Sequence, residues 1–82
     1  MKGYLGEIRW VTDDYTPQNW AHCNGQNLPV HEYPELFGLL RTVYGGDGKR
    51  SFTLPDLTDR EKLQGGRFLI CARGPMPLLF AS

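Results

Sequence analysis

The side chains best suited to acid–base or nucleophilic chemistry in this sequence are two histidines, His22 and His31, and two cysteines, Cys23 and Cys71. None of them has neighbours at the spacing of a known nucleophile motif. His22 and Cys23 are adjacent, and adjacent residues of a strand point to opposite faces of its sheet. We therefore expect Cys23 to be a small core residue and His22 to lie on the solvated face. The sequence predicts that the protein is not an enzyme.

Three carboxylates, Asp47, Asp56 and Asp59, bracket a glycine-rich stretch where oxygen ligands could hold a cation. Their spacing does not match an EF-hand loop, which needs ligands at alternate positions and a glutamate at the twelfth. Asp47 stands between two glycines and is more simply a turn residue whose side chain bonds nearby backbone. Zinc is disfavoured because the cysteines and histidines lack paired short spacings. We predict no cofactor, with a structural cation near Asp47 as an open alternative.

Residues 45–51 contain three glycines, a lysine and a serine, as phosphate-binding loops do. The stretch lacks the four-residue gap of such a loop, and it follows a predicted helix instead of opening one. No helix N-terminus would therefore face the anion. The sequence favours a structural turn at this place.

Size and charge narrow the class of protein further. The chain has 82 residues and a formal net charge of zero, so we expect one domain over residues 1–82 and no nucleic-acid partner. No apolar run is long enough to span a bilayer, and no secretory pattern is visible. We expect both thiols to be reduced and buried, with a disulfide between them as the open alternative. A core of this size contributes only about 3–5 kcal/mol, which favours oligomerisation or docking into a larger assembly.

The first 30 residues alternate between short strands and turns. Tyr4 to Val11 has the period of a half-buried strand, with Ile8 and Trp10 on one face. A second strand at 19–23 meets Asn24 and Gly25, a strong hairpin signal, and the returning strand would be 26–30. Pro29 cannot donate to a sheet ladder, so this strand should lie at an edge.

One helix is predicted from about Tyr33 to Tyr44, with Pro34 in its first turn and an apolar stripe that includes Leu36, Leu40 and Val43. Glycines at 45 and 46 end it. A strand follows at 51–54, then a polar loop at 58–66. The apolar run within 67–73 predicts a closing strand covered on both faces, and residues 76–82 form an apolar tail. The expected fold is a small, mostly-β α+β domain.

The predicted elements divide the residues of interest into a core set, a turn set and a set of interface candidates. The expected core is Ile8, Trp20, Cys23, Leu36, Phe37, Leu40, Phe52, Leu54, Phe68 and Ile70. The expected turn residues are Asn24, Gly25, Gly45, Gly46, Asp47, Gly48, Pro55 and Asp56. The interface candidates, which lie near turns or at the end of the chain, are Trp10, Tyr15, Lys49, Arg50, Leu78, Leu79 and Phe80.

Five pieces in order give the chain a family resemblance. They are GEI at 6–8, PQNWAHCNGQ at 17–26, YPELF at 33–37, TVYGGDG at 42–48 and FTLPDL at 52–57. Together they resemble the phage tail collar domain over residues 5–57, and the closing strand at about 67–73 is similar to that of longer members. Those members carry a sizeable insert before the closing strand, where this chain has only residues 58–66. The chain therefore looks like a short form of the family.

The resemblance implies a structural component of a phage tail, such as a fibre, spike or baseplate module, located in the virion and made in the host cytoplasm. It implies other tail or baseplate proteins as partners and a homo-oligomer, with a trimer favoured. The alternatives are a module that recognises a host-surface glycan or protein, and a part of a phage-derived bacterial injection system. The short form places in doubt any receptor contact that the insert would carry.

Overall fold

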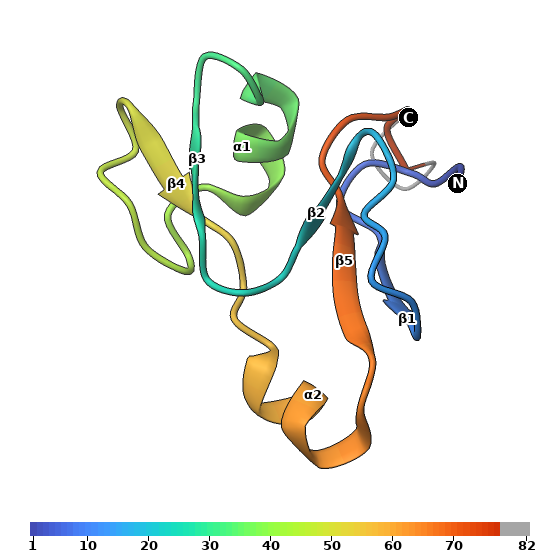
Figure 1. Ribbon diagram of the computed structural model, residues 1–82. Helices are drawn as coiled ribbons and strands as arrows, with labels where there is room; N and C mark the ends of the chain where they lie inside the picture. The colour runs from blue at the N-terminus through green and yellow to red at the C-terminus, as the bar shows by residue number, and fades with distance from the viewer. Residues whose placement is uncertain (78–82) are drawn as a thin grey trace.

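A computed structural model describes residues 1–77 of the chain as five short strands in two antiparallel sheets, with two short helices. The predicted class, a mostly-β α+β fold, is confirmed. The tail candidates Leu78, Leu79 and Phe80 lie outside the described residues. The elements are, in chain order, β1 (Ile8–Val11), β2 (Trp20–His22), β3 (Asn27–Pro29), α1 (Pro34–Leu40), β4 (Ser51–Thr53), α2 (Thr58–Gln64) and β5 (Arg67–Cys71) (Figure 1).

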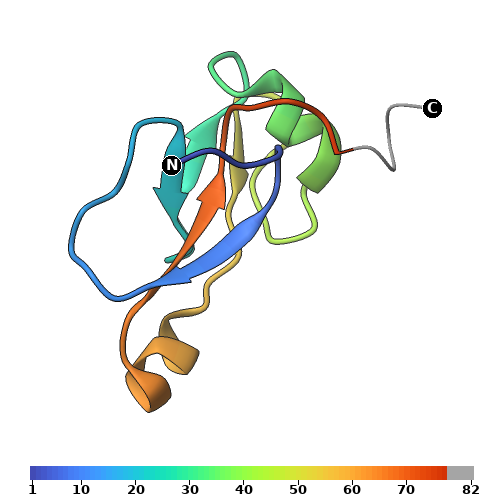
Figure 2. The ribbon, with the colours of Figure 1, turned by 90° about the vertical axis from the view of Figure 1, so that its right-hand side faces the viewer.

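The larger sheet has the order β1-β5-β2, so the last strand of the described residues lies in the middle (Figure 1). Its register places Trp10 opposite Phe68 on one side and Ala21 opposite Ile70 on the other. Leu69, Ile70 and Cys71 are all buried. The prediction of a closing strand covered on both faces is therefore confirmed, although β5 ends at Cys71. In both views α2 projects away from the two sheets (Figures 1 and 2).

The predicted hairpin around Asn24 and Gly25 is wrong. β2 pairs with β5, and β3 pairs with β4 in the smaller sheet, so the two segments that flank the turn have different partners. The turn itself forms: Gly25 has a φ of 78°, and the Asn24 side chain accepts the Gln26 N–H at 3.1 Å. The turn then lies against the chain at Asp56, with which Asn24 forms an isolated bridge. The local turn signal was correct, but it did not determine which strands pair.

Helix α1 is shorter than predicted. It begins at Pro34 and ends at Leu40, and Arg41 has a φ of 52°, outside the helical region. The Val43 side chain is 76% exposed, so it is not part of the buried stripe. The chain turns there because the Gly45 carbonyl accepts the Thr53 N–H of β4 at 3.2 Å. Continuing the helix to Tyr44 would remove this contact between the loop and the smaller sheet.

The segment predicted as a polar loop contains helix α2 (Thr58–Gln64). Asp56 prepares its start, since one carboxylate oxygen accepts the Thr58 N–H at 3.1 Å and the Thr58 hydroxyl at 2.6 Å. These hydrogen bonds lower the pKa of Asp56. The helix ends at Gly65, which has a φ of 78°. The sequence did not predict this helix, because the helix has no buried residue and therefore no apolar stripe.

The main core lies between α1 and the two sheets. Its buried residues are Leu5, Cys23, Leu28, Leu36, Phe52, Leu54, Ile70 and Ala72. Phe37, Leu40 and Phe68 pack against this cluster and are partly buried. A smaller cluster on the other side of β5 consists of Trp20, Leu69 and Cys71. Phe37 meets Phe52 with ring centroids 5.5 Å apart, a separation typical of favourable aromatic pairs.

The alternation predicted for β1 has the right period, but the predicted burial of Ile8 in the core is wrong. Ile8 and Trp10 are 44% and 47% exposed, whereas Val11 on the opposite face packs against the smaller cluster. Ile8 is therefore not a core residue. The reason is that β1 lies at the edge of its sheet, where α1 and the smaller sheet do not cover the face that Ile8 and Trp10 share.

We expect Phe52→Ala to unfold the domain at room temperature. Phe52 is fully buried, and truncating a buried phenylalanine costs about 3–5 kcal/mol, which matches the whole stability expected for a domain of this size. Urea and thermal denaturation followed by circular dichroism will measure the loss. Val43→Ala is the matched control and should leave the unfolding midpoint unchanged. A cooperative transition with an unchanged midpoint in Phe52→Ala would contradict this assignment of the core.

Candidate functional site

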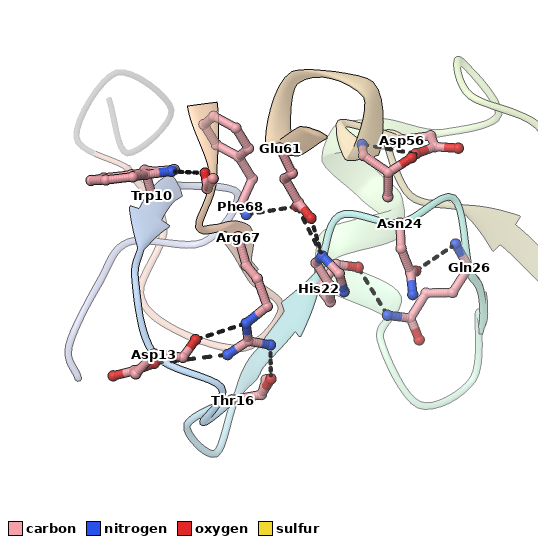
Figure 3. Close-up of polar contacts among 12 residues, drawn as sticks. Trp10, Asp13, Thr16, His22, Asn24, Gln26, Asp56, Glu61, Arg67 and Phe68 are labelled. Carbon is pink, nitrogen blue, oxygen red and sulfur yellow. Dashed lines mark hydrogen bonds and ion pairs between the residues drawn. The ribbon is translucent and has the colours of Figure 1, made fainter. Parts of the chain in front are cut away.

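Arg67, the first residue of β5, holds the loop between β1 and β2 against the sheet. Its guanidinium donates to the carbonyls of Asp13 at 3.0 Å and Tyr15 at 2.6 Å, and to the hydroxyl of Thr16 at 2.9 Å. Figure 3 shows the Asp13 and Thr16 contacts. The Tyr15 side chain is 68% exposed on this loop. The loop thus presents one aromatic side chain to solvent and is fixed by two hydrogen bonds to its backbone carbonyls and one to the Thr16 side chain.

Trp10, another predicted interface residue, lies over the end of α2. Its indole Nε1 donates to the Gly65 carbonyl at 2.9 Å (Figure 3). Gly66 lies directly under the ring, where a Cβ would clash with both the indole and the Val11 carbonyl. Only glycine therefore fits at 66. Trp10 joins β1 to the α2–β5 connection while leaving about half of its surface exposed.

Glu61 of α2 connects the helix to the central strand β5 and to the outer strand β2 of the larger sheet (Figure 3). Its carboxylate accepts the Phe68 N–H at 2.9 Å and contacts the His22 Nε2 at 2.8 Å. Desolvation works to raise the pKa of Glu61, but these two hydrogen bonds, together with the nearby charges of His22 and Arg67, outweigh it and the pKa is lowered. Sequence reasoning missed this group, because its members are 39 and 7 residues apart along the chain and form no motif.

The loop after α1 is organised around Asp47. One oxygen of its carboxylate accepts the N–H groups of Lys49 at 2.9 Å, Arg50 at 2.9 Å and Ser51 at 3.1 Å. These bonds lower the pKa of Asp47 from its ordinary value of 3.8 to about 2. Gly46 has a φ of 93°, and a Cβ there would lie 2.5 Å from the Phe52 Cα. The hydrogen bonds of Asp47 and the close approach of Gly46 to Phe52 fix the loop, which exposes the Lys49 and Arg50 side chains.

The residues considered first for catalysis do not form a catalytic group. Cys23 is fully buried, and burial, with a smaller contribution from the Glu61 charge, raises the pKa of its thiol to about 12. The thiolate is therefore disfavoured at neutral pH, which argues against a nucleophile. Cys71 is also a buried free thiol. His31 is largely exposed and lies near Glu32, whereas His22 is bound to Glu61 instead of being freely solvated.

No group of three or more His, Cys, Asp or Glu side chains within residues 1–77 is arranged to hold a metal ion. Asp47 uses one oxygen for three backbone N–H groups, and Asp56 uses one for Thr58. These carboxylates therefore organise their own turns. No helix of the described segment has the length and apolar character needed to cross a bilayer.

One cavity of about 460 Å³ lies between the N-terminal segment and the face of the larger sheet that carries Trp20. Arg9 of β1 lies over the Trp20 ring, with its Cζ 5.3 Å from the ring centroid, and its Nε also binds the Glu7 carboxylate. The Trp20 Nε1 donates to the Met1 carbonyl at 3.1 Å. These contacts account for the burial of Trp20 and for the orientation of the Glu7–Arg9 pair.

The polar side chains described above have structural roles: Arg67 and Asp47 fix loops, and Glu61 attaches helix α2 to the larger sheet. This arrangement is typical of a small structural module. The sequence model of the Phage Tail Collar Domain matches residues 6–62. The chain belongs to this family, whose domain is a structural element of phage tails and not an enzyme family. The matched region ends inside α2 and excludes β5. Neither a curated protein nor a solved structure matches the chain.

We expect Asp47→Asn to lower the stability of the domain at neutral pH. Because the folded chain depresses the pKa of Asp47 from 3.8 to about 2, the carboxylate's contribution is fully present above about pH 4. It is lost as the pH falls towards 2. The difference in melting temperature between the wild type and Asp47→Asn should therefore shrink across this interval.

The matched control is Asp59→Asn, which neutralises an exposed carboxylate of α2. Its melting temperature should follow that of the wild type at each pH. A difference for Asp47→Asn that stays constant between pH 5 and pH 2 would show that the three backbone hydrogen bonds do not depend on the charge.

Proposed function

We propose that this chain is an assembly module of a phage tail, within a fibre, spike or baseplate. Its partners in this proposal are other tail or baseplate proteins and further copies of itself, and it is made in the host cytoplasm before it enters the virion. A trimer is the oligomer that the family resemblance favours. The observation that carries the proposal is the collar match over residues 6–62.

The construction of the fold supports a role in assembly. The exposed aromatic and basic candidates Tyr15, Lys49 and Arg50 stand on loops whose backbones are fixed by the Arg67 guanidinium and the Asp47 carboxylate. A contact surface built on fixed loops loses little conformational entropy when it binds. Trp10 and Ile8 add exposed apolar surface on β1. Such surfaces suit permanent neighbours in a particle.

The test uses the phage or prophage that encodes the chain. Quantitative mass spectrometry of purified particles should find the protein in fixed stoichiometry with known tail proteins, and deletion of its gene should give particles with incomplete tails. Expression of the wild-type gene in trans is the control and should restore complete tails. A protein found only in the lysate, with normal tails after deletion, would overturn the proposal.

Recognition of a host-surface glycan or protein is the second candidate, and the exposed Tyr15 on its fixed loop favours it. Tyr15→Ala should then reduce phage adsorption by about tenfold or more, since aromatic anchors dominate binding surfaces. Val43→Ala, which also truncates an exposed side chain, is the control. Adsorption that is unchanged in Tyr15→Ala and in the double variant Lys49→Ala/Arg50→Ala would exclude these loops from receptor contact. Genes for a contractile injection apparatus beside this one would instead favour the phage-derived bacterial system.

A further inference from the structure

The two edges of the larger sheet differ in their free hydrogen-bonding groups. At the β2 edge, the Trp20 N–H donates to the Pro17 carbonyl at 3.1 Å. The His22 carbonyl accepts from the Asn24 N–H at 2.9 Å and from the Gln26 side-chain amide at 2.9 Å. The flanking loops of the same chain thus close this edge at two of its outward groups, the Trp20 N–H and the His22 C=O. A further strand could not add to β2 without displacing them.

The β1 edge is open in the described part of the chain. The Glu7 carbonyl accepts the Cys71 N–H at 2.8 Å, and hydrogen-bonding direction alternates along an antiparallel strand. The backbone groups of Arg9 and Val11 therefore face β5, and those of Ile8 and Trp10 face outward. Outside the β1–β5 ladder, no hydrogen bond within residues 1–77 reaches the N–H or C=O of Ile8 or Trp10. An edge with such groups is a template for pairing with another chain.

A β-bulge limits how far this open edge extends. Gly6 and Glu7 both lie opposite Cys71: the Gly6 N–H donates to the Cys71 carbonyl at 2.9 Å, and the Glu7 carbonyl accepts the Cys71 N–H. Gly6 has a φ of 82°, the conformation that glycine supplies in bulges of the G1 type. The bulge ends the regular ladder just before Ile8. Only the short β1 edge can pair with another strand, so the side chains of this edge determine which strand binds there.

We infer that the β1 edge pairs antiparallel with the β1 edge of a second copy of this chain, with the two-fold axis at Ile8. In this register the two Ile8 residues exchange their backbone hydrogen bonds and bring their exposed side chains together. Glu7 of each copy then lies opposite Arg9 of the other. The result is a continuous six-stranded sheet across the two copies.

The charges of Glu7 and Arg9 favour a second copy of this chain as the partner of the β1 edge, and they favour one pairing register. Glu7 and Arg9 flank Ile8 with opposite signs, so a two-fold axis at Ile8 makes two complementary pairs from a single sequence. An axis at Arg9 would instead place two guanidiniums opposite each other, which is unfavourable. A ring built by joining the β1 edge to the β2 edge of a neighbour is blocked, because the β2 edge is closed. The pair is therefore self-limiting at two copies.

This contact does not depend on the proposed tail function, because it follows from the sheet edge alone. The interface is short, and interfaces well below about 1,200 Å² are weak. We therefore expect a concentration-dependent dimer of the isolated chain, with no trimer formed through this edge. Within an assembled particle, the neighbouring proteins would raise the effective concentration.

The experiment uses charge reversal in two variants, Glu7→Arg and Arg9→Glu. Each variant alone places like charges opposite each other at both symmetric positions, so dimerisation should weaken by about tenfold or more in sedimentation equilibrium. An equimolar mixture of the two should recover dimers, since the two basic positions of one chain then face two acidic positions of the other. The Glu7–Arg9 contact within each chain is lost in both variants and is not restored by mixing. Recovery can therefore come only from contacts between chains.

The matched controls reverse the exposed Asp59–Lys62 pair of α2, as Asp59→Arg and Lys62→Glu. Both should dimerise like the wild type, and circular dichroism should show that all four variants are folded. Ile8→Pro provides an independent check, because it removes the outward N–H and leaves the bonds to β5 in place; it should abolish the dimer. A monomeric wild type, an association that persists in the single reversals, or a mixture that stays monomeric would overturn the inference.

Discussion

The antiparallel pairing of β5 with both β1 and β2 is the contact on which the rest of the structure depends. β1 and β2 pair only through β5 within the larger sheet. Ile70 of β5 belongs to the main core, while Leu69 and Cys71 belong to the smaller cluster on its other side. One five-residue strand therefore holds together the sheet and both apolar clusters. Because β5 lies beyond the collar match at 6–62, residues after the matched region complete the fold of this chain.

The short connection between β4 and β5 explains how the chain closes without a long insert. After β4, Asp56 caps the turn into α2, and α2 ends where glycines 65 and 66 redirect the chain into β5. Glu61 then accepts the Phe68 N–H and binds His22 of β2. The connection is thus attached to the strand that follows it and to the far edge of the sheet. A seven-residue helix with no buried residue remains in place through these polar contacts.

Local sequence signals predicted the elements of this fold better than their pairing. The apolar run at 67–73 predicted a strand covered on both faces, because such burial requires apolar residues at every position. The Asn24–Gly25 turn was also visible, but the partners of the flanking strands depend on contacts as distant as Trp20 with Cys71, 51 residues apart. The same limit applies to Arg67 and Glu61, whose bonds join segments with no shared motif. Ile8 was misplaced because alternation gives the period of a strand and not which face is covered.

The unequal edges of the sheet constrain how such modules can be joined. A sheet with two open edges can extend without limit, which proteins usually prevent. Here the loops around β2 close one edge, and the bulge at Gly6 shortens the other. Edge pairing can therefore add one strand and then stops. Any assembly larger than a pair must use other surfaces, and the two loops fixed by Arg67 and Asp47 are rigid enough to serve, since their backbone hydrogen bonds are already made before a neighbour arrives.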